Sequence, residues 1–218
     1  MTGGRLAAEV ERVPGDAASR MRIAAGVLLL LGGTGTLLGI VTAEALYPVT
    51  FDPGVNTVSD LAAMRPENLV RQPSAAIFDT TMIAMGVCIA AGALLLHRSE
   101  RRRATTISLL GLAAGMVGVG FVHGDHLAAH TALAYLAFLS GGISAWCAAG
   151  WQRPPLTWAL RALGTFALGA LIGYTLLQDT AAMRALGEGG AERLVVYPVV
   201  LALVVLGTTL ARPRRVRA

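Results

Sequence analysis

The stretch IAAGVLLLLGGTGTLLGIVTA, residues Ile23–Ala43, contains 21 consecutive residues without a formal charge. An α-helix rises about 1.5 Å per residue, so about 20 apolar residues cross the hydrocarbon core of a bilayer. A cleaved signal peptide is the rival interpretation, because basic residues precede the stretch and Ala43 and Ala45 have the spacing of a cleavage site. Signal peptides have apolar cores of about 7–15 residues, so the length favours a retained membrane helix.

Five further apolar segments follow, and the chain as a whole is 55% hydrophobic and only 14% charged. Soluble domains usually contain about 25% charged residues. We therefore expect one all-α domain, a polytopic membrane bundle of about six helices at residues 23–211. A tail at 1–22 precedes it, a basic tail at 212–218 follows, and residues 47–74 form a long outer loop. The predicted spans are Ile23–Ala45, Ala75–Leu96, Thr105–Val122, Leu127–Trp151, Leu156–Leu177 and Leu194–Ala211.

The distribution of arginine predicts the orientation. All 18 basic residues are Arg, and 14 of them lie on one side of a six-helix arrangement. The other side has only Arg65, Arg71, Arg184 and Arg193. By the positive-inside rule both termini are cytoplasmic, in the cell membrane. Short basic clusters between apolar segments suit anionic membrane lipids and not a nucleic-acid partner.

Small residues four apart allow helix backbones to approach closely within a membrane. Three glycine pairs have this spacing and predict close helix contacts: Gly35 with Gly39, Gly111 with Gly115, and Gly169 with Gly173.

The outer loop has turn residues near its start and then Ser59-Asp60-Leu61, which predicts a short helix with Ser59 or Asp60 as its N-cap. The side chains of Asn56, Ser59 and Asp60 suit turns and caps. We expect them to hold the loop down on the polar helix ends below.

Polar residues gather in one layer at the outer face, where the sharpest pattern is His123-Gly124-Asp125-His126-x-x-x-His130. Histidines four apart share one helix face, so His126 and His130 are candidate ligands of one ion. His123 or a carboxylate would complete a zinc shell with an open position for water. Zinc-bound water has a pKa near 7, which permits hydrolysis. The alternative is that these histidines cap helix ends and contact interfacial water.

Asp79 falls in the first turn of the second predicted span, where an unpaired carboxylate is costly. We expect it to belong to one polar network with His130, as an ion pair or a carboxylate–histidine–metal relay. Glu44 lies at similar depth, and Glu192, Arg193 and Tyr197 open the last span.

Several short motifs occur in order over about residues 25 to 210. They are Tyr47-Pro48 with Asn56-Thr57-Val58-Ser59-Asp60-Leu61, then Phe78-Asp79, then Gly118-Val119-Gly120-Phe121 with Asp125 and His130, then Glu192-Arg193-Leu194 with Tyr197-Pro198. The ordered set resembles the bacterial membrane family called domain of unknown function 998. Asp79 departs from the amide expected in that family, and His123 and His126 stand where no histidine is expected. The resemblance implies a fold and a site location, with only His130 carried over among the histidines, and it implies no activity.

These observations favour an outer-facing pocket that acts on a lipid or other hydrophobic molecule, as a metal-assisted hydrolase. In this hypothesis His126, His130 and His123 bind zinc, and Asp125 or Asp79 orients water or a ligand histidine. Ser59 and Asp60 cap the pocket, and the residues expected to contact substrate are Asn56, Glu192, Arg193 and Tyr197. Two alternatives stay open: a non-enzymatic structural, chaperone-like or transport-associated bundle, and a membrane cyclase or isomerase that uses Asp79 or Glu44 as a proton donor.

Overall fold

The computed structural model describes residues 14–122 and 126–213, which form six α-helices and one short 3₁₀ helix. Their bounds are α1 Pro14–Ala45, η1 Ser59–Leu61, α2 Ser74–Glu100, α3 Arg103–Phe121, α4 Leu127–Ala149, α5 Leu156–Leu176 and α6 Ala181–Ala211. Each of the six α-helices of this described part is long and apolar enough to cross a membrane. The chain is therefore an all-α, multi-pass membrane protein, which confirms the predicted fold class.

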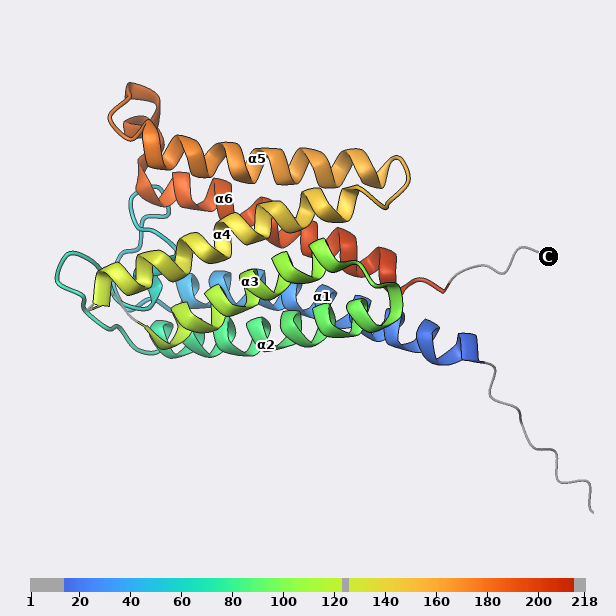
Figure 1. The fold of residues 1–218 in the computed structure, drawn as a ribbon. Coiled ribbons are helices and arrows are strands. Elements are labelled where there is room, and N and C mark those ends of the chain that lie inside the picture. Colours follow the sequence, from blue (N-terminus) through green and yellow to red (C-terminus); the bar gives the residue numbers. More distant parts are fainter. Residues whose placement is uncertain (1–13, 123–125, 214–218) are drawn as a thin grey trace, which may run out of the picture.

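Consecutive helices pack against one another, and α6 returns to contact α1 as well as α5 (Figure 1). The start of α1 and the end of α6 lie at one end of the bundle, which we call the termini end. The segment 46–73 lies at the opposite end, which we call the loop end. Helix α5 packs on α4 and α6 at the edge of the bundle and is the least buried of the six.

Two of the three predicted glycine pairs lie at helix contacts. A Cβ on Gly39 of α1 would lie 2.3 Å from Thr81 of α2, and one on Gly115 of α3 would lie 2.6 Å from the Ala137 backbone of α4. The prediction is wrong for the third pair, because Gly169 of α5 has no heavy atom of another residue within 4 Å of its added Cβ among those described. Instead, Gly26 and Gly207 bring the backbones of α1 and α6 into contact.

The largest difference from the predicted spans is at the start of α6, which begins at Ala181 and not at Leu194. The Thr180 side chain caps this first segment by accepting a hydrogen bond from Met183 N at 3.4 Å. Gly187 then interrupts the helix with φ 74° and ψ 163°, a conformation that favours glycine. The residues after Gly187 therefore turn into the bundle as the membrane part of α6.

Candidate functional site

The outer loop lies on the start of the membrane part of α6, as expected, and Arg193 holds it there. The Arg193 guanidinium donates to the backbone oxygens of Pro53 and Asn56, both at 2.8 Å, and forms an ion pair with Glu44 of α1. Gly189 permits this close approach, because a Cβ there would lie 2.2 Å from Asn56 O. One buried side chain therefore joins α1, α6 and the loop.

Glu192, the residue before Arg193, holds the next part of the loop. Its buried carboxylate accepts hydrogen bonds from Val58 N at 2.5 Å, from Ser59 Oγ at 3.0 Å and from Ser59 N at 3.4 Å. Hydrogen bonds to a carboxylate are stronger than bonds between neutral groups, and they offset the cost of burying the charge. The segment Val58–Ser59 is thus fixed against α6.

Within the loop, Asp60 organises a second set of bonds. Its buried carboxylate accepts from Thr57 N at 2.8 Å and from Arg65 Nε at 2.9 Å. Arg65 Nη2 also lies 3.5 Å from the exposed Glu188 carboxylate. Burial disfavours the charged Arg65 side chain, but Asp60 and Glu188 outweigh that effect and raise the pKa of Arg65 above its ordinary value.

The short helix η1 begins at Ser59 as predicted, but the predicted cap is wrong. Val58 occupies the N-cap position and its own side chain makes no capping hydrogen bond, whereas Thr57 Oγ1 accepts from Asp60 N at 3.2 Å. The Asp60 carboxylate turns back to Thr57 N instead, because Arg65 balances its charge on the other side.

A small polar chamber of about 60 Å³ lies beneath this loop, between α4, α5 and α6. Its polar lining consists of Thr57, Ser59, Arg65, His130, Thr131, Tyr135, Tyr174 and Glu192. Loop and helix residues that are far apart in the sequence therefore converge on one enclosed space.

The hydrogen bond of His130 shows which of its two ring nitrogens carries the proton. Its Nδ1 lies 2.6 Å from Val122 O, and because a carbonyl oxygen only accepts, Nδ1 must carry the proton. In the neutral ring the lone pair is then on Nε2. The imidazole is buried, and Nε2 has no hydrogen-bond partner within the described part of the chain.

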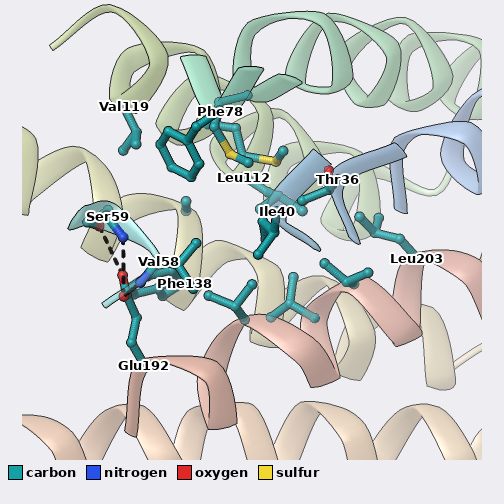
Figure 2. A pocket seen from close by; sticks show the side chains of 17 residues that line it. Thr36, Ile40, Val58, Ser59, Phe78, Leu112, Val119, Phe138, Glu192 and Leu203 are labelled. Carbon is teal, nitrogen blue, oxygen red and sulfur yellow. Dashed lines mark hydrogen bonds between the residues drawn. The ribbon is translucent and has the colours of Figure 1, made fainter. Parts of the chain in front are cut away.

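An apolar cavity of about 60 Å³ adjoins the polar chamber and extends into the bundle. Figure 2 shows Glu192, Val58 and Ser59 at one end of this cavity, with Thr36 of α1 and Leu203 of α6 toward the other. Apolar side chains from α1, α2, α3, α4 and α6 make most of its wall, among them Ile40, Phe78, Leu112, Phe138 and Leu203.

The two spaces share four wall residues: Ser59, Ala134, Phe138 and Glu192. Arg65 and Leu127 line both the polar chamber and a larger open hollow on the surface of the loop end. The three linings therefore connect an open polar surface, a small polar chamber and an apolar cavity.

The predicted metal ligands are only partly described. His123 and Asp125 lie outside the described residues, His126 is exposed at the start of α4, and His130 is buried. Within residues 14–122 and 126–213, no group of three His, Cys, Asp or Glu is arranged to hold a metal ion. A zinc site at His130 would need His123 or Asp125, which lie outside this part.

Four other predicted positions do not line the chamber, and Asn56 makes the turn contact that was expected of it. Asp79 and Tyr197 are half-buried and line neither the polar chamber nor the apolar cavity. His130 bonds to Val122 O and not to Asp79, so the predicted direct pair is not formed. Glu44, the candidate proton donor, is engaged by Arg193. Asn56 lies on the outer hollow and accepts from Asp52 N at 3.0 Å.

Three residues of this site were not predicted from the sequence: Arg65, Tyr135 and Tyr174. Arg65 carried a usable signal, because it is one of four arginines on the arginine-poor side of the chain. The two tyrosines carried none, since each lies within an apolar span.

Comparison with known proteins gives one match. Residues 30–209 match the family model described as "Protein of unknown function (DUF998)". No curated protein and no solved structure matches the chain. The match extends from α1 to α6 and includes the loop, the chamber and the cavity, so the chain belongs to the DUF998 family, as the ordered motifs predicted.

Proposed function

We propose that this protein binds a single-chain lipid or a similarly elongated hydrophobic molecule at the loop end and hydrolyses a bond near its polar end. The proposal rests on the wall that the polar chamber and the apolar cavity share. A molecule seated across Ser59, Ala134 and Phe138 places its chain in the cavity and its head in the chamber. Ligand sites commonly combine such an apolar lining with a few convergent polar groups.

His130 is the general base in this proposal. His130 lines the chamber, and its Nε2 has the lone pair. In this proposal Nε2 accepts a proton from the water molecule that attacks the bond and returns it to the leaving oxygen. Arg65 is the cation of the chamber, and it stabilises the negative charge that develops on the attacked group. Glu192 and Asp60 position the Ser59 and Arg65 side chains.

Zinc would strengthen this chemistry by lowering the pKa of the attacking water. His130 Nε2 is a suitable ligand, and His126 with His123 or Asp125 would have to supply the others. A chelator therefore distinguishes His130 as a metal-free general base from the histidines as zinc ligands. Activity that survives the chelator would assign the role of base to His130. Activity that is lost and then restored by zinc assigns the histidines to metal.

We further propose that the loop end faces outward from the cytoplasmic membrane and that both termini are cytoplasmic. The arginine asymmetry between the two ends supports this orientation. The hydrophobic molecule would then enter from the outer leaflet, at the depth of the chamber.

Binding is tested by filling the shared wall. Ala134 is buried on the wall, and Ala132 is exposed on the same helix, so Ala134→Leu and Ala132→Leu form a matched pair. The purified protein is irradiated with a diazirine-labelled palmitate, and labelled peptides are identified by mass spectrometry. We expect labelling in 130–138 and 192–203 that Ala134→Leu lowers several-fold and Ala132→Leu leaves unchanged. Equal labelling of the two variants would show that the probe does not occupy the cavity.

Hydrolysis is tested separately with a fluorogenic ester of palmitate. His130→Gln should abolish turnover while it retains photolabelling, because the ring touches the head and not the chain. Turnover that persists at the parent rate in His130→Gln would remove His130 from the mechanism. Labelling without turnover in the parent protein would support binding alone.

A further inference from the structure

A second hollow, of about 500 Å³, lies at the termini end, opposite the proposed lipid site. It is lined by Arg22 of α1, Arg102 at the start of α3, and Trp151, Gln152, Arg153 and Leu156 at the α4–α5 turn. Figure 1 shows the start of α1, the α2–α3 turn and the α4–α5 turn at this end.

The charge of this hollow is strongly positive. Three guanidinium groups line it, and none of its described lining residues is acidic. Glu100 lies close by and pairs with Arg22 at 3.3 Å and, more weakly, with Arg102 at 4.0 Å. The described lining of the hollow therefore contains three arginines and no carboxylate of its own.

Two buried donor atoms in the hollow have no acceptor within the described part of the chain. The Arg102 guanidinium lies 4.9 Å from the centre of the Trp151 ring, whose Nε1 donates to Thr105 Oγ1 at 3.1 Å. Arg102 Nε and Gln152 Nε2 are buried, and neither has a hydrogen-bond partner within the described part of the chain. A buried donor without a partner is costly, so an acceptor at either of these two atoms would stabilise the hollow.

Two helix N-termini add to the positive potential. Helix α3 begins at Arg103, directly after Arg102, and α5 begins at Leu156. The N-terminus of a helix has a partial positive charge that favours anions. Arginine forks match the geometry of phosphate oxygens, which makes phosphate the anion that this donor set suits best.

We propose that this hollow binds a phosphate group, contributed by the headgroup of an anionic phospholipid. Trp151, Pro154 and Leu156 give it an apolar rim, which suits a phosphate that is attached to a lipid. The site is separate from the chamber and does not depend on the function proposed for the loop end.

The test uses the full-length protein in detergent and native mass spectrometry with phosphatidylglycerol and phosphatidylcholine as probes. Arg102→Gln and Arg153→Gln each remove one charge from the lining. Arg103→Gln is the matched control, because Arg103 is exposed, adjacent in sequence and not part of the lining. We expect phosphatidylglycerol to bind more tightly than phosphatidylcholine, and each lining variant to lower its affinity about ten-fold. Arg103→Gln should change the affinity less than two-fold.

Thermal melting without added lipid shows whether each variant folds, and Arg153→Gln gives an independent result if Arg102→Gln is unstable. A third arm adds inorganic phosphate as a competitor. Displacement of phosphatidylglycerol by millimolar phosphate supports the phosphate site and indicates that it also accepts the free anion. Equal binding of the two lipids, or an equal loss in Arg103→Gln, would overturn the proposal, because unspecific attraction to a basic surface would then explain the binding.

Discussion

Truncation of Glu192 should release the outer loop from α6. The carboxylate accepts two backbone N–H groups and one hydroxyl from Val58 and Ser59. Glu192→Ala removes all three bonds and leaves the buried Val58 N–H without an acceptor. Glu192→Gln is milder, because the amide oxygen can accept from Val58 N while the amide nitrogen donates to Ser59 Oγ.

The magnitude follows from these contacts. A hydrogen bond to a charged group contributes about 1.5–3 kcal/mol, and an unsatisfied buried donor costs about 1–3 kcal/mol. These two figures overlap in part, so we expect Glu192→Ala to lower the free energy of unfolding by about 2–4 kcal/mol. Glu192→Gln should lower it by about 1 kcal/mol, since the bonds persist without the charge. At this chain length, 2–4 kcal/mol corresponds to a fall in Tm of roughly 10 °C.

Thermal melting of the detergent-solubilised protein, followed by tryptophan fluorescence, measures these differences. Glu188→Ala is the control on the same helix, because Glu188 is 67% exposed and its ion pair with Arg65 is long at 3.5 Å. We expect that control to change stability by less than about 0.5 kcal/mol. Limited trypsin digestion at Arg71 should be faster in Glu192→Ala, whereas the Arg65-Pro66 bond resists trypsin in both proteins. An unchanged Tm and an unchanged cleavage rate would refute the role of Glu192 as a loop anchor.

Three further predictions concern the backbone, the titration and the topology of the loop end. Gly187→Ala should lower stability by about 1–3 kcal/mol, because φ is 74° and the added Cβ would lie 2.1 Å from Gly54 O. Gly169→Ala, in open space, is the control for melting and should be neutral or slightly stabilising. Burial raises the pKa of the Tyr47 hydroxyl above its ordinary value of 10.0, while Arg71 lowers it and Asp60 raises it further. The tyrosine therefore ionises at lower pH in the unfolded state than in the folded state, so stability falls as pH rises through about 10. Tyr47→Phe should remove that alkaline fall in Tm, and an equal fall in both proteins would assign it to another group. Reporter fusions after Arg102 and after Arg217 should give cytoplasmic signals, and one within residues 55–71 an external signal; a cytoplasmic loop signal would invert the proposed orientation.

The helices were predictable from sequence because each span must satisfy a length rule that the bilayer imposes. Ile23–Ala43 needs no partner to be recognised as a span, and the same holds for the other five. The start of α6 was missed, because residues 181–193 contain four charged residues and three glycines, a composition that does not predict a membrane helix.

The site was predictable in place but not in detail. Glu192, Arg193, Ser59 and Asp60 do converge at the loop end, yet Arg193 was expected to contact substrate and instead contacts backbone oxygens of Pro53 and Asn56. Residue identity does not reveal such a role, because every residue has a backbone oxygen and only the folded loop decides which ones lie near a guanidinium. The same holds for His130, whose Nδ1 bonds to the Val122 carbonyl.

Glu192 and Arg193, which are neighbours on α6, hold two different parts of the loop. Residues i and i+1 on a helix point about 100° apart. Arg193 accordingly reaches Glu44 and residues 53–56, away from the chamber. Glu192 reaches Ser59 on the chamber wall and Val58 on the wall of the apolar cavity. The loop is therefore fastened at two points by one turn of helix, and only the second point borders the proposed substrate. Ser59 and Arg65 of the loop and His130 of α4 all line the chamber, so part of its wall is present only while the loop lies on the helices. The hydrolysis that we propose would therefore depend on this anchoring as well as on His130, which takes no part in it.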